Sequence, residues 1–367
     1  MDNLRVIIAG GGTGGHIFPA VAIGHALQRM RPGTQLLFVG AKNKMEMEKV
    51  PQEGFEIIGL DIAGFQRGSI LKNLSLPFKL LKSKMQARSI IRQFKPGVIV
   101  GVGGYASFPV LNAGQGMNIP TLIQEQNSFA GKSNKILGKR AEAICVAYEN
   151  MEQFFPKDKI IITGNPVRKN ISDMSKTSEE GIASFGLKNN VKTILIVGGS
   201  LGAKSINESI DEGLDELMKE DVQVIWQTGK PYHAQAKRRI GGYSSKVKVF
   251  DFIKEMDSAY AAADIVISRA GALAIAELCI VGKPVIFVPY PHAAEDHQTS
   301  NAMALVKRNA AALVKDSDAK TELVNKLRSI LKDSDMQKIM SENLKTMAIK
   351  DADERIANKV IQIAGLN

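Results

Sequence analysis

Two apolar runs that end in glycine-rich turns constrain the fold of this chain most. The first, VIIA at residues 6–9, leads into GGGTGGH at 10–16, and the second, ILIV at 194–197, leads into GGSLGA at 198–203. A glycine turn between a buried strand and a helix is typical of the first βα junction of a doubly wound parallel sheet. Strand-like runs alternate with helical stretches after each junction. We therefore predict an α/β fold with two doubly wound domains.

The first turn also fits dinucleotide-binding enzymes, because Gly10, Gly12 and Gly15 follow the G-x-G-x-x-G spacing. Such enzymes need an acidic residue about 20 positions further on, at the end of the next strand, to bind the adenosine ribose. Here that strand runs into Gly-Ala-Lys, and the nearest acidic residues, Glu46 and Glu48, fall in the helical stretch that follows. The spacing therefore disfavours a dinucleotide, and we predict no cofactor.

Length and composition indicate a two-domain protein with substantial cores, because the chain has 367 residues and a hydrophobic fraction of 44%. The N-terminus has no basic region followed by an apolar segment, so we expect the protein to stay in the cytoplasm. Cys145 and Cys279 lie far apart in apolar surroundings, which predicts reduced core thiols rather than a disulfide or a metal site.

The boundary between the domains is expected near TGNPVR at 163–168, which precedes a polar segment rich in Lys and Ser. We place the first domain at 1–163 and the second at 164–341, and we expect a C-terminal helix of about 342–367 to pack back on the first domain. Two doubly wound domains that face each other form a cleft between the carboxyl edges of their sheets, which is the usual ligand position in such folds.

The net charge of +11 is concentrated in one segment. Residues 62–124 contain no Asp or Glu. The part of this segment up to residue 95 mixes bulky apolar side chains with Arg67, Lys72, Lys79, Lys82, Lys84, Arg88, Arg92 and Lys95. This mixture suits the surface of an anionic bilayer, whereas nucleic-acid binding favours aromatic side chains, of which the segment has few. We predict peripheral membrane binding and no nucleic-acid partner; a solvated amphipathic helix is the alternative. Glycines and prolines interrupt the uncharged stretch at 96–124, so we do not expect it to span a membrane.

Two stretches of the second half are suited to an anionic nucleotide. GGSLGA is expected to place Ser200 at a helix start, and SRAGALAIAE is expected to start a helix just after Gly271. Backbone N–H groups and the positive end of a helix favour phosphate at such places. Glu277 follows about one turn after Ala274, where a carboxylate can accept both hydroxyls of a ribose. An acidic residue that only caps the helix is the alternative.

Seven motifs of the chain together resemble the MurG family of peptidoglycan glycosyltransferases. They are GGTGGHIFPA, GVGGYASFPV, QEQNSFAGKSNK, TGNPVR, GGSLGAKSIN, SRAGALAIAEL and PHAAEDHQTSNA, in the family's order. The resemblance implies a GT-B fold, two Rossmann-like domains with an interdomain cleft. It implies transfer of N-acetylglucosamine (GlcNAc) from UDP-GlcNAc to undecaprenyl-pyrophosphoryl-MurNAc-pentapeptide (lipid I), which gives lipid II, at the cytoplasmic face of the cell membrane. It also implies protein partners from the wall-synthesis machinery.

The resemblance further implies roles for individual residues. Donor binding falls to Thr13, Gly14, Gly15, Asn127, Arg168, Ser200, Ile253, Ala272, Leu273, Ala274, Ile275, Ala276, Glu277 and Gln298. Acceptor binding falls to Gly12, Gly103, Gly104, Tyr105 and Glu125. The chain departs from the family at Ala274, where members can carry Thr, and at Gln298, which stands alone where some relatives have two consecutive glutamines.

In detail, the backbone of Ile253 is expected at uracil and Glu277 at the ribose. Ser200 and Arg168 are expected at the diphosphate. Gln298 and Asn127 are expected at the GlcNAc hydroxyls.

The implied reaction is an inverting displacement, in which the MurNAc 4-hydroxyl attacks the anomeric carbon, UDP leaves and a β-1,4 link forms. His16 is the candidate general base, because an imidazole with a pKa near ~6.5 is partly neutral at cytoplasmic pH; helix capping or orientation of a neighbour is its alternative role. Backbone N–H groups and Arg168 are expected to stabilise the departing diphosphate. The chain has no paired-aspartate motif, so we expect no protein-bound metal and activity that survives EDTA.

Two other functions remain open at this point. A UDP-GlcNAc 2-epimerase type of enzyme would share the architecture but use no lipid acceptor, and a non-catalytic nucleotide-binding membrane scaffold would need no base. The basic and apolar segment argues against the epimerase.

Overall fold

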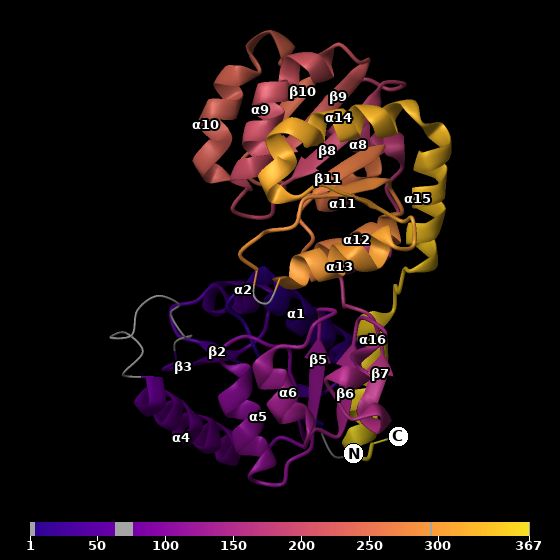
Figure 1. The fold of residues 1–367 in the computed structure, drawn as a ribbon. Helices are drawn as coiled ribbons and strands as arrows, with labels where there is room; N and C mark the ends of the chain where they lie inside the picture. The colour runs from indigo at the N-terminus through magenta and orange to yellow at the C-terminus, as the bar shows by residue number, and fades with distance from the viewer. Residues whose placement is uncertain (1–3, 63–75, 294–295, 367) are drawn as a thin grey trace. The chain divides into compact units, whose positions relative to one another are not determined.

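The computed structural model describes residues 4–62, 76–293 and 296–366. The chain divides into two compact units, one formed by Met1–Arg168 with Asp351–Asn367 and the other by Lys169–Lys350 (Figure 1). Each unit contains one parallel β-sheet with helices on both faces. The predicted fold class, two doubly wound α/β domains, is confirmed.

The sheet of the first unit has seven strands in the order β3-β2-β1-β4-β5-β6-β7. These strands are β1 (Arg5–Ala9), β2 (Gln35–Ala41), β3 (Ile57–Leu60), β4 (Val98–Gly101), β5 (Thr121–Glu125), β6 (Ala143–Val146) and β7 (Ile160–Ile162). The helices of this unit are α1 (Gly14–Met30), α2 (Glu46–Gln52), α4 (Leu76–Phe94), α5 (Ser107–Gln115), α6 (Lys132–Gly138) and the C-terminal α16 (Ala352–Ile363).

Side chains that alternate along β1 build the core on both faces of this sheet. Val6 and Ile8 are buried in the cluster that includes α1 and α16. Ile7 and Ala9 are buried in the cluster that includes α4, α5 and α6. The continuous apolar run VIIA is therefore explained by a central strand with two covered faces, as is typical of parallel sheets.

The sheet of the second unit has six strands in the order β10-β9-β8-β11-β12-β13. These strands are β8 (Lys192–Val197), β9 (Val222–Gln227), β10 (Val247–Phe250), β11 (Ile265–Ser268), β12 (Val285–Phe287) and β13 (Ala312–Leu313). The helices of this unit are α7 (Lys169–Ser172), α8 (Ser178–Ser184), α9 (Lys204–Met218), α10 (Lys230–Arg239), α11 (Met256–Ala262), α12 (Ala272–Val281), α13 (His297–Val306), α14 (Ala319–Lys332) and α15 (Ser334–Thr346).

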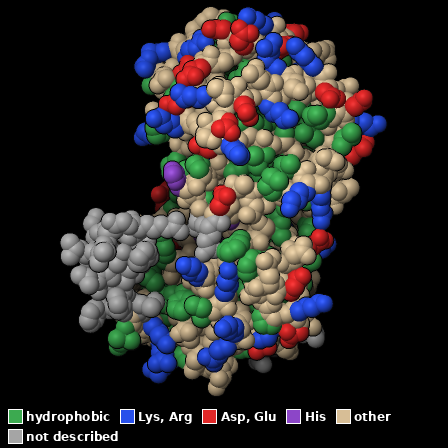
Figure 2. Space-filling view, in the orientation of Figure 1, with side chains coloured by type: hydrophobic (Ala, Val, Ile, Leu, Met, Phe, Trp, Pro, Cys, Tyr) green, Lys and Arg blue, Asp and Glu red, His purple; other side chains and the backbone are tan. Residues whose placement is uncertain are grey.

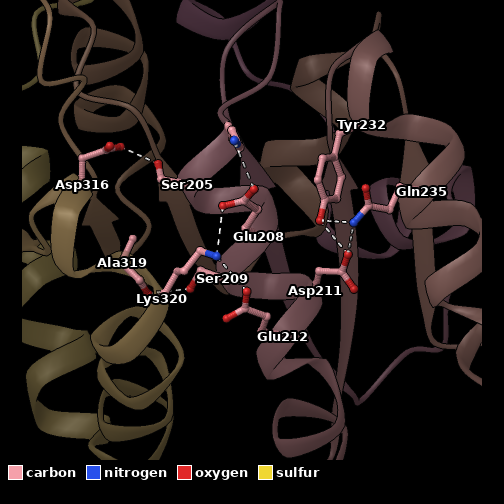
Figure 3. A network of polar contacts seen from close by, with 11 residues as sticks. Ser205, Glu208, Ser209, Asp211, Glu212, Tyr232, Gln235, Asp316, Ala319 and Lys320 are labelled. Atoms are coloured by element: carbon pink, nitrogen blue, oxygen red, sulfur yellow. Dashed lines mark hydrogen bonds and ion pairs between the residues drawn. The ribbon is translucent and has the colours of Figure 1, made fainter.

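Helix α9 is joined to its two neighbours on one face of this sheet by polar contacts (Figure 3). Lys320 of α14 donates to Glu212 at 2.9 Å and lies 3.2 Å from Glu208. On the other side of α9, Asp211 accepts a hydrogen bond from the Tyr232 hydroxyl of α10 at 2.6 Å. These contacts fix the helix that follows the second glycine turn.

The boundaries of the units differ from the expected ones at 163 and 342. Asn165 donates to the Gln126 carbonyl at 3.0 Å and accepts from Gln124 at 2.9 Å, so the segment after β7 belongs to the first unit. Helix α15 stays with the second unit because Met340 and Leu344 are buried in its cores. Of the helices that follow the second unit's sheet, only the last one, α16, belongs to the first unit.

Both cysteines are buried and unpaired, as predicted. Burial raises the pKa of the Cys145 thiol and of the Cys279 thiol to about 12. These residues are therefore core side chains and not reactive nucleophiles.

Candidate functional site

In the first unit the candidate site lies where the strand order changes direction, between β1 and β4. The turns that follow these two strands therefore meet at the carboxyl edge of the sheet. The Gly11 N–H donates to the Gly103 carbonyl at 3.3 Å. A Cβ atom at position 104 would lie 2.1 Å from the Gly11 carbonyl oxygen, so only glycine permits this approach. Gly103 and Gly104 thus shape the first glycine turn.

Helix α1 begins directly at this turn. Thr13 is the N-cap, and its carbonyl accepts the N–H groups of His16 and Ile17 at 3.0 and 3.1 Å. Gly14 and Gly15 form the first helical residues, and Thr13 and Gly15 are exposed. The first turn of a helix presents N–H groups without intrahelical partners, so this end of α1 can receive an anion.

The half-buried His16 ring is held by backbone groups of the same turns. Its Nδ1 atom lies 3.1 Å from the Gly11 carbonyl oxygen. Because a carbonyl can only accept, Nδ1 carries the proton in this contact, and Nε2 of the neutral ring is left as an acceptor. A Cβ atom at Gly103 would lie 2.9 Å from Nε2, so this glycine makes room for the ring. Tyr105, two residues further on, is exposed.

Glu46 is a site residue that the sequence did not reveal. The side chain is only 1% exposed, and both oxygens accept backbone hydrogen bonds, from Gly12 at 2.7 Å and from Ala41 at 2.9 Å. The N–H of Gly12, a residue expected at the acceptor, therefore binds this carboxylate. From the sequence, Glu46 was considered only as a ribose ligand. Glu46 is the first residue of α2, which follows the strand beside β1. This position was the available signal that its carboxylate binds backbone N–H groups.

Glu125 is buried beneath the loop between β5 and α6. Its carboxylate accepts from the Asn127 N–H at 3.1 Å, the Asn127 side-chain amide at 3.3 Å, the Gly131 N–H at 3.2 Å and the Asn134 amide at 2.8 Å. Burial raises the pKa of Glu125, although these hydrogen bonds favour the charged form. The residue expected at the acceptor therefore organises the loop that carries Asn127.

Arg168 is the last residue of the first unit. Its guanidinium lies over the Phe18 ring of α1, 5.7 Å from the centroid. This contact places one of the predicted diphosphate ligands beside the helix that carries His16.

In the second unit the strand order changes direction between β8 and β11. The turn after β8 closes with a hydrogen bond from the Gly202 N–H to the Gly199 carbonyl at 3.0 Å. Both glycines have positive φ, 87° and 78°, which a helix does not accept. Helix α9 therefore begins only at Lys204, and Ser200 lies in an exposed turn rather than at the predicted helix start.

Gln227, at the end of β9, joins this turn to the one after β10. Its amide donates to the Gly199 carbonyl at 3.0 Å and accepts from the Ile253 N–H at 2.8 Å. The N–H of Ile253, a backbone group expected at uracil, is thus bound to Gln227. Gln227 was not predicted from the sequence, where its place as a polar residue at the end of the strand-like run VQVIWQ was the available signal.

Helix α12 begins where the sequence predicts, with Gly271 as its N-cap and Ala272 as its first residue. Leu273 and Ala274 follow in the half-buried first turn, and the Ile275 N–H closes that turn on the Gly271 carbonyl at 3.0 Å. The side chain of Ile275 points into the core, and Ala276 is half-buried.

Glu277 is buried one turn into α12. It accepts a hydrogen bond from the Tyr260 hydroxyl of α11 at 3.0 Å. Tyr260 was not predicted as a site residue, because 17 positions separate it from Glu277 in the sequence. The pair fixes the position of the carboxylate beside the start of α12.

Gln298 and Arg269 both hold the loop that follows β12. The Gln298 side-chain oxygen accepts from the Tyr290 N–H at 2.9 Å. Arg269 donates to the carbonyls of Val288 and Pro289 at 2.9 and 3.1 Å and pairs with Asp316. Arg269 was not predicted from the sequence, because its partners are far from it along the chain: Ser205 precedes it, and Val288, Pro289 and Asp316 follow it.

The predicted membrane segment falls partly outside the described residues. Arg67 and Lys72 lie outside them, and so does the side chain of Lys79. Within α4, Leu81 and Met85 are 61% and 65% exposed. Lys84 is half-buried, whereas Arg88, Arg92 and Lys95 are exposed. Figure 2 shows basic and hydrophobic side chains next to each other over this helix.

Among the basic side chains of α4 that the structure describes, Lys82 forms an ion pair. Its ammonium lies 3.0 Å from Asp61, which Lys42 also contacts at 2.8 Å. Hydrogen bonds from Lys42 and Lys82 hold the pKa of Asp61 well below its usual range. Lys82 therefore offers less net charge to an anionic surface than its neighbours do.

No helix of residues 4–62, 76–293 and 296–366 is long and apolar enough to cross a bilayer. The same residues contain no group of three or more His, Cys, Asp or Glu side chains that could hold a metal ion.

Two family models match the chain. The glycosyltransferase family 28 N-terminal domain matches residues 6–146, and the glycosyltransferase family 28 C-terminal domain matches residues 193–356. The first match lies within the first unit, and the second covers most of the second unit and continues to residue 356, into the start of α16.

Two relatives that match nearly the whole chain carry the same enzyme name. A protein of Cytophaga hutchinsonii is 54% identical over 98% of this chain and 96% of its own length, and one of Phocaeicola vulgatus is 53% identical over 99% and 97%. Both are named UDP-N-acetylglucosamine–N-acetylmuramyl-(pentapeptide) pyrophosphoryl-undecaprenol N-acetylglucosamine transferase.

Among solved structures, Acinetobacter baumannii MurG is similar with a TM-score of 0.81 and 30% identity, over 98% of this chain and 99% of that one. The two doubly wound domains are thus those of the GT-B fold. The N-terminal and C-terminal family models match the chain in this order, and the chain is more than 50% identical to a relative over nearly its full length. This chain therefore belongs to glycosyltransferase family 28.

Proposed function

We propose that this protein transfers GlcNAc from UDP-GlcNAc to the 4-hydroxyl of MurNAc in undecaprenyl-pyrophosphoryl-MurNAc-pentapeptide, the conversion of lipid I to lipid II in peptidoglycan synthesis. The observation that carries this function is the identity of 53–54% over nearly the full length of transferases named for it. The protein is accordingly a UDP-GlcNAc-dependent hexosyltransferase.

In this proposal the second unit binds the donor. The N–H groups at the start of α12 and in the exposed turn around Ser200 receive the diphosphate, because such groups favour anions. Glu277, held by Tyr260, accepts the ribose hydroxyls. Gln298, which accepts a hydrogen bond from the Tyr290 N–H, forms hydrogen bonds with the sugar hydroxyls.

The first unit binds the acceptor and supplies the base. The glycine turns after β1 and β4, with Gly12, Gly103 and Gly104, receive the lipid pyrophosphate, and Nε2 of His16 takes the proton from the MurNAc 4-hydroxyl. As the O–H bond breaks, the oxygen forms a bond to the anomeric carbon from the face opposite UDP. The bond between this carbon and the diphosphate oxygen breaks at the same time, and UDP leaves with the electron pair. The anomeric configuration is thereby inverted.

The surface of α4 that carries Leu81, Met85, Arg88 and Arg92 is the proposed contact with the anionic cytoplasmic face of the membrane. Its apolar side chains enter the headgroup region, and its cations attract acidic lipids. The enzyme thereby reaches an acceptor whose lipid tail is embedded in the bilayer.

One experiment separates this function from its two alternatives. Radiolabelled UDP-GlcNAc is incubated with the enzyme, with and without lipid I, and label is followed in the lipid and nucleotide fractions. We expect label in the lipid fraction only when lipid I is present. Lipid-independent conversion of the nucleotide sugar would identify an epimerase, and no turnover in either sample would identify a scaffold.

A further inference from the structure

A single peptide group connects the buried Glu46 carboxylate to the His16 ring. The carbonyl of Gly11 contacts His16 Nδ1 at 3.1 Å, and the N–H of Gly12 donates to Glu46 Oε2 at 2.7 Å. These two groups belong to the same peptide bond. Since the C=O and N–H of a trans peptide point in opposite directions, Glu46 and His16 lie at opposite ends of this group.

The backbone around Glu46 is built to hold its carboxylate in this place. A Cβ atom at Gly11 would lie 2.3 Å from the Glu46 carboxyl carbon, and one at Gly40 would lie 2.5 Å from its Cγ atom. Gly11 and Gly12 have φ values of 137° and 90°, which are open chiefly to glycine. The second carboxylate oxygen is fixed by the Ala41 N–H at 2.9 Å. The glycines of the turn thus accommodate a carboxylate as well as a ligand.

The arrangement has a direct electrostatic consequence for the histidine. A buried anion that accepts the Gly12 N–H polarises the peptide and makes the Gly11 carbonyl a stronger acceptor, because hydrogen bonds in series strengthen one another. A stronger acceptor at Nδ1 holds the proton on that atom and increases the basicity of Nε2, as carboxylates do for ring nitrogens they contact directly.

We propose that Glu46 is a positioning residue that orients and activates His16 through the Gly11–Gly12 peptide group. The inference rests on the proposed role of His16 as general base. Other titratable or charged groups on the surrounding elements are Tyr105 after β4, Glu125 at the end of β5 and Arg168 beside Phe18. Glu46 is joined to the ring by the hydrogen bonds described above.

The test compares Glu46→Gln with Glu48→Gln, a matched control that removes the same charge from an exposed position of α2. We expect Glu46→Gln to lower kcat by about tenfold to a hundredfold, the range for partners that orient a functional histidine. The acidic limb of its pH–rate profile should move to lower pH, since the protonated imidazole is less stabilised without the carboxylate. The KM for UDP-GlcNAc should not change, and Glu48→Gln should behave as the parent.

A double-mutant comparison shows whether Glu46 acts through His16. In a His16→Ala background, Glu46→Gln should cause no further loss of kcat, because the group on which it acts is gone. A full additional loss would overturn the inference, as would an unchanged pH–rate profile in the single variant. Parental activity in His16→Ala would refute the role of His16 and the inference with it, while label transfer to lipid I by the parent would still establish the transferase.

A readout independent of turnover is the NMR titration of the His16 ring, identified among the five histidines by its loss in His16→Ala. Its midpoint should fall in Glu46→Gln and stay unchanged in Glu48→Gln; equal midpoints in all three proteins would contradict the inference. Thermal unfolding is measured first. If Glu46→Gln does not fold, Glu46→Asp replaces it, because the shorter side chain keeps the charge but withdraws it from the Gly12 N–H, and the same shift is expected.

Discussion

At the scale of single residues, we expect donor binding to depend most on Glu277. Replacing Glu277 by Ala removes the acceptor proposed for the ribose hydroxyls, so the KM for UDP-GlcNAc should rise by about 10-fold to 150-fold, equivalent to about 1.5–3 kcal/mol for hydrogen bonds to a charged group. The KM for lipid I should change little. Tyr260→Phe keeps the ring and removes only the hydroxyl that contacts Glu277, so a smaller rise is expected. Steady-state kinetics with each substrate varied in turn provide the measurement, and an unchanged donor KM in Glu277→Ala would exclude it from the donor site.

The two cysteines give a second prediction at this scale. Because burial raises the pKa of both thiols to about 12, only about one molecule in ten thousand carries either thiolate at pH 8, and the reactive fraction grows as the pH rises. The native protein should therefore react very slowly with a thiol reagent such as DTNB at pH 8. Unfolding in guanidinium should release both thiols at once. Rapid reaction of one thiol in the native protein would show that its surroundings open readily.

At the scale of secondary-structure elements, the exposed face of α4 is expected to bind anionic membranes. The double variant Arg88→Glu/Arg92→Glu should sediment less with phosphatidylglycerol vesicles than the parent and should turn over bilayer-embedded lipid I more slowly. Turnover of a short-chain soluble acceptor should be nearly unchanged. Salt at 1 M should mimic the charge reversal, because the screening length then falls to about 3 Å.

The control for this experiment is Lys237→Glu/Arg238→Glu, which changes the net charge equally on exposed positions of α10 in the second unit. It should sediment with vesicles as the parent does. If the α4 variant binds as well as this control, α4 is an ordinary solvated helix.

The elements themselves were largely predictable, because their signals are local. Apolar runs such as VIIA and ILIV indicate buried strands, and the glycines after them indicate the turns at which both sheets change direction. The start of α9 was not predictable from these signals. Gly199 and Gly202 both adopt positive φ and delay the helix to Lys204, a conformation that depends on packing as well as on glycine content.

The supporting residues of the site were hidden for a related reason. Glu46 contacts Gly12 across 34 positions, and Gln227 contacts Gly199 across 28. Only the fold brings such pairs together, so spacing along the sequence carries no sign of them. Glu125 was predicted at the acceptor, and its burial beneath its own loop could not be inferred from the motif that contains it.

At the scale of the whole molecule, each unit has its own cores on the two faces of its sheet, so calorimetry should resolve contributions from two domains. UDP-GlcNAc at about 100 times its Kd should stabilise the second unit by about 2.7 kcal/mol and raise its transition most. Leu27→Ala in the first unit and Leu327→Ala in the second, both fully buried side chains, identify the two transitions. If UDP-GlcNAc raises only the transition temperature that Leu27→Ala lowers, the donor binds to the first unit, which would contradict the proposal.

The stereochemistry of the product tests the central claim most directly. UDP-GlcNAc labelled with ¹³C at the anomeric carbon is converted in the presence of lipid I, and the isolated lipid is analysed by NMR. Direct displacement of UDP by the MurNAc 4-hydroxyl predicts that the label appears in a β-1,4-linked GlcNAc on the lipid, inverted from the α-configured donor. An α-linked product, or label that leaves UDP-GlcNAc only as another nucleotide sugar, would contradict the account.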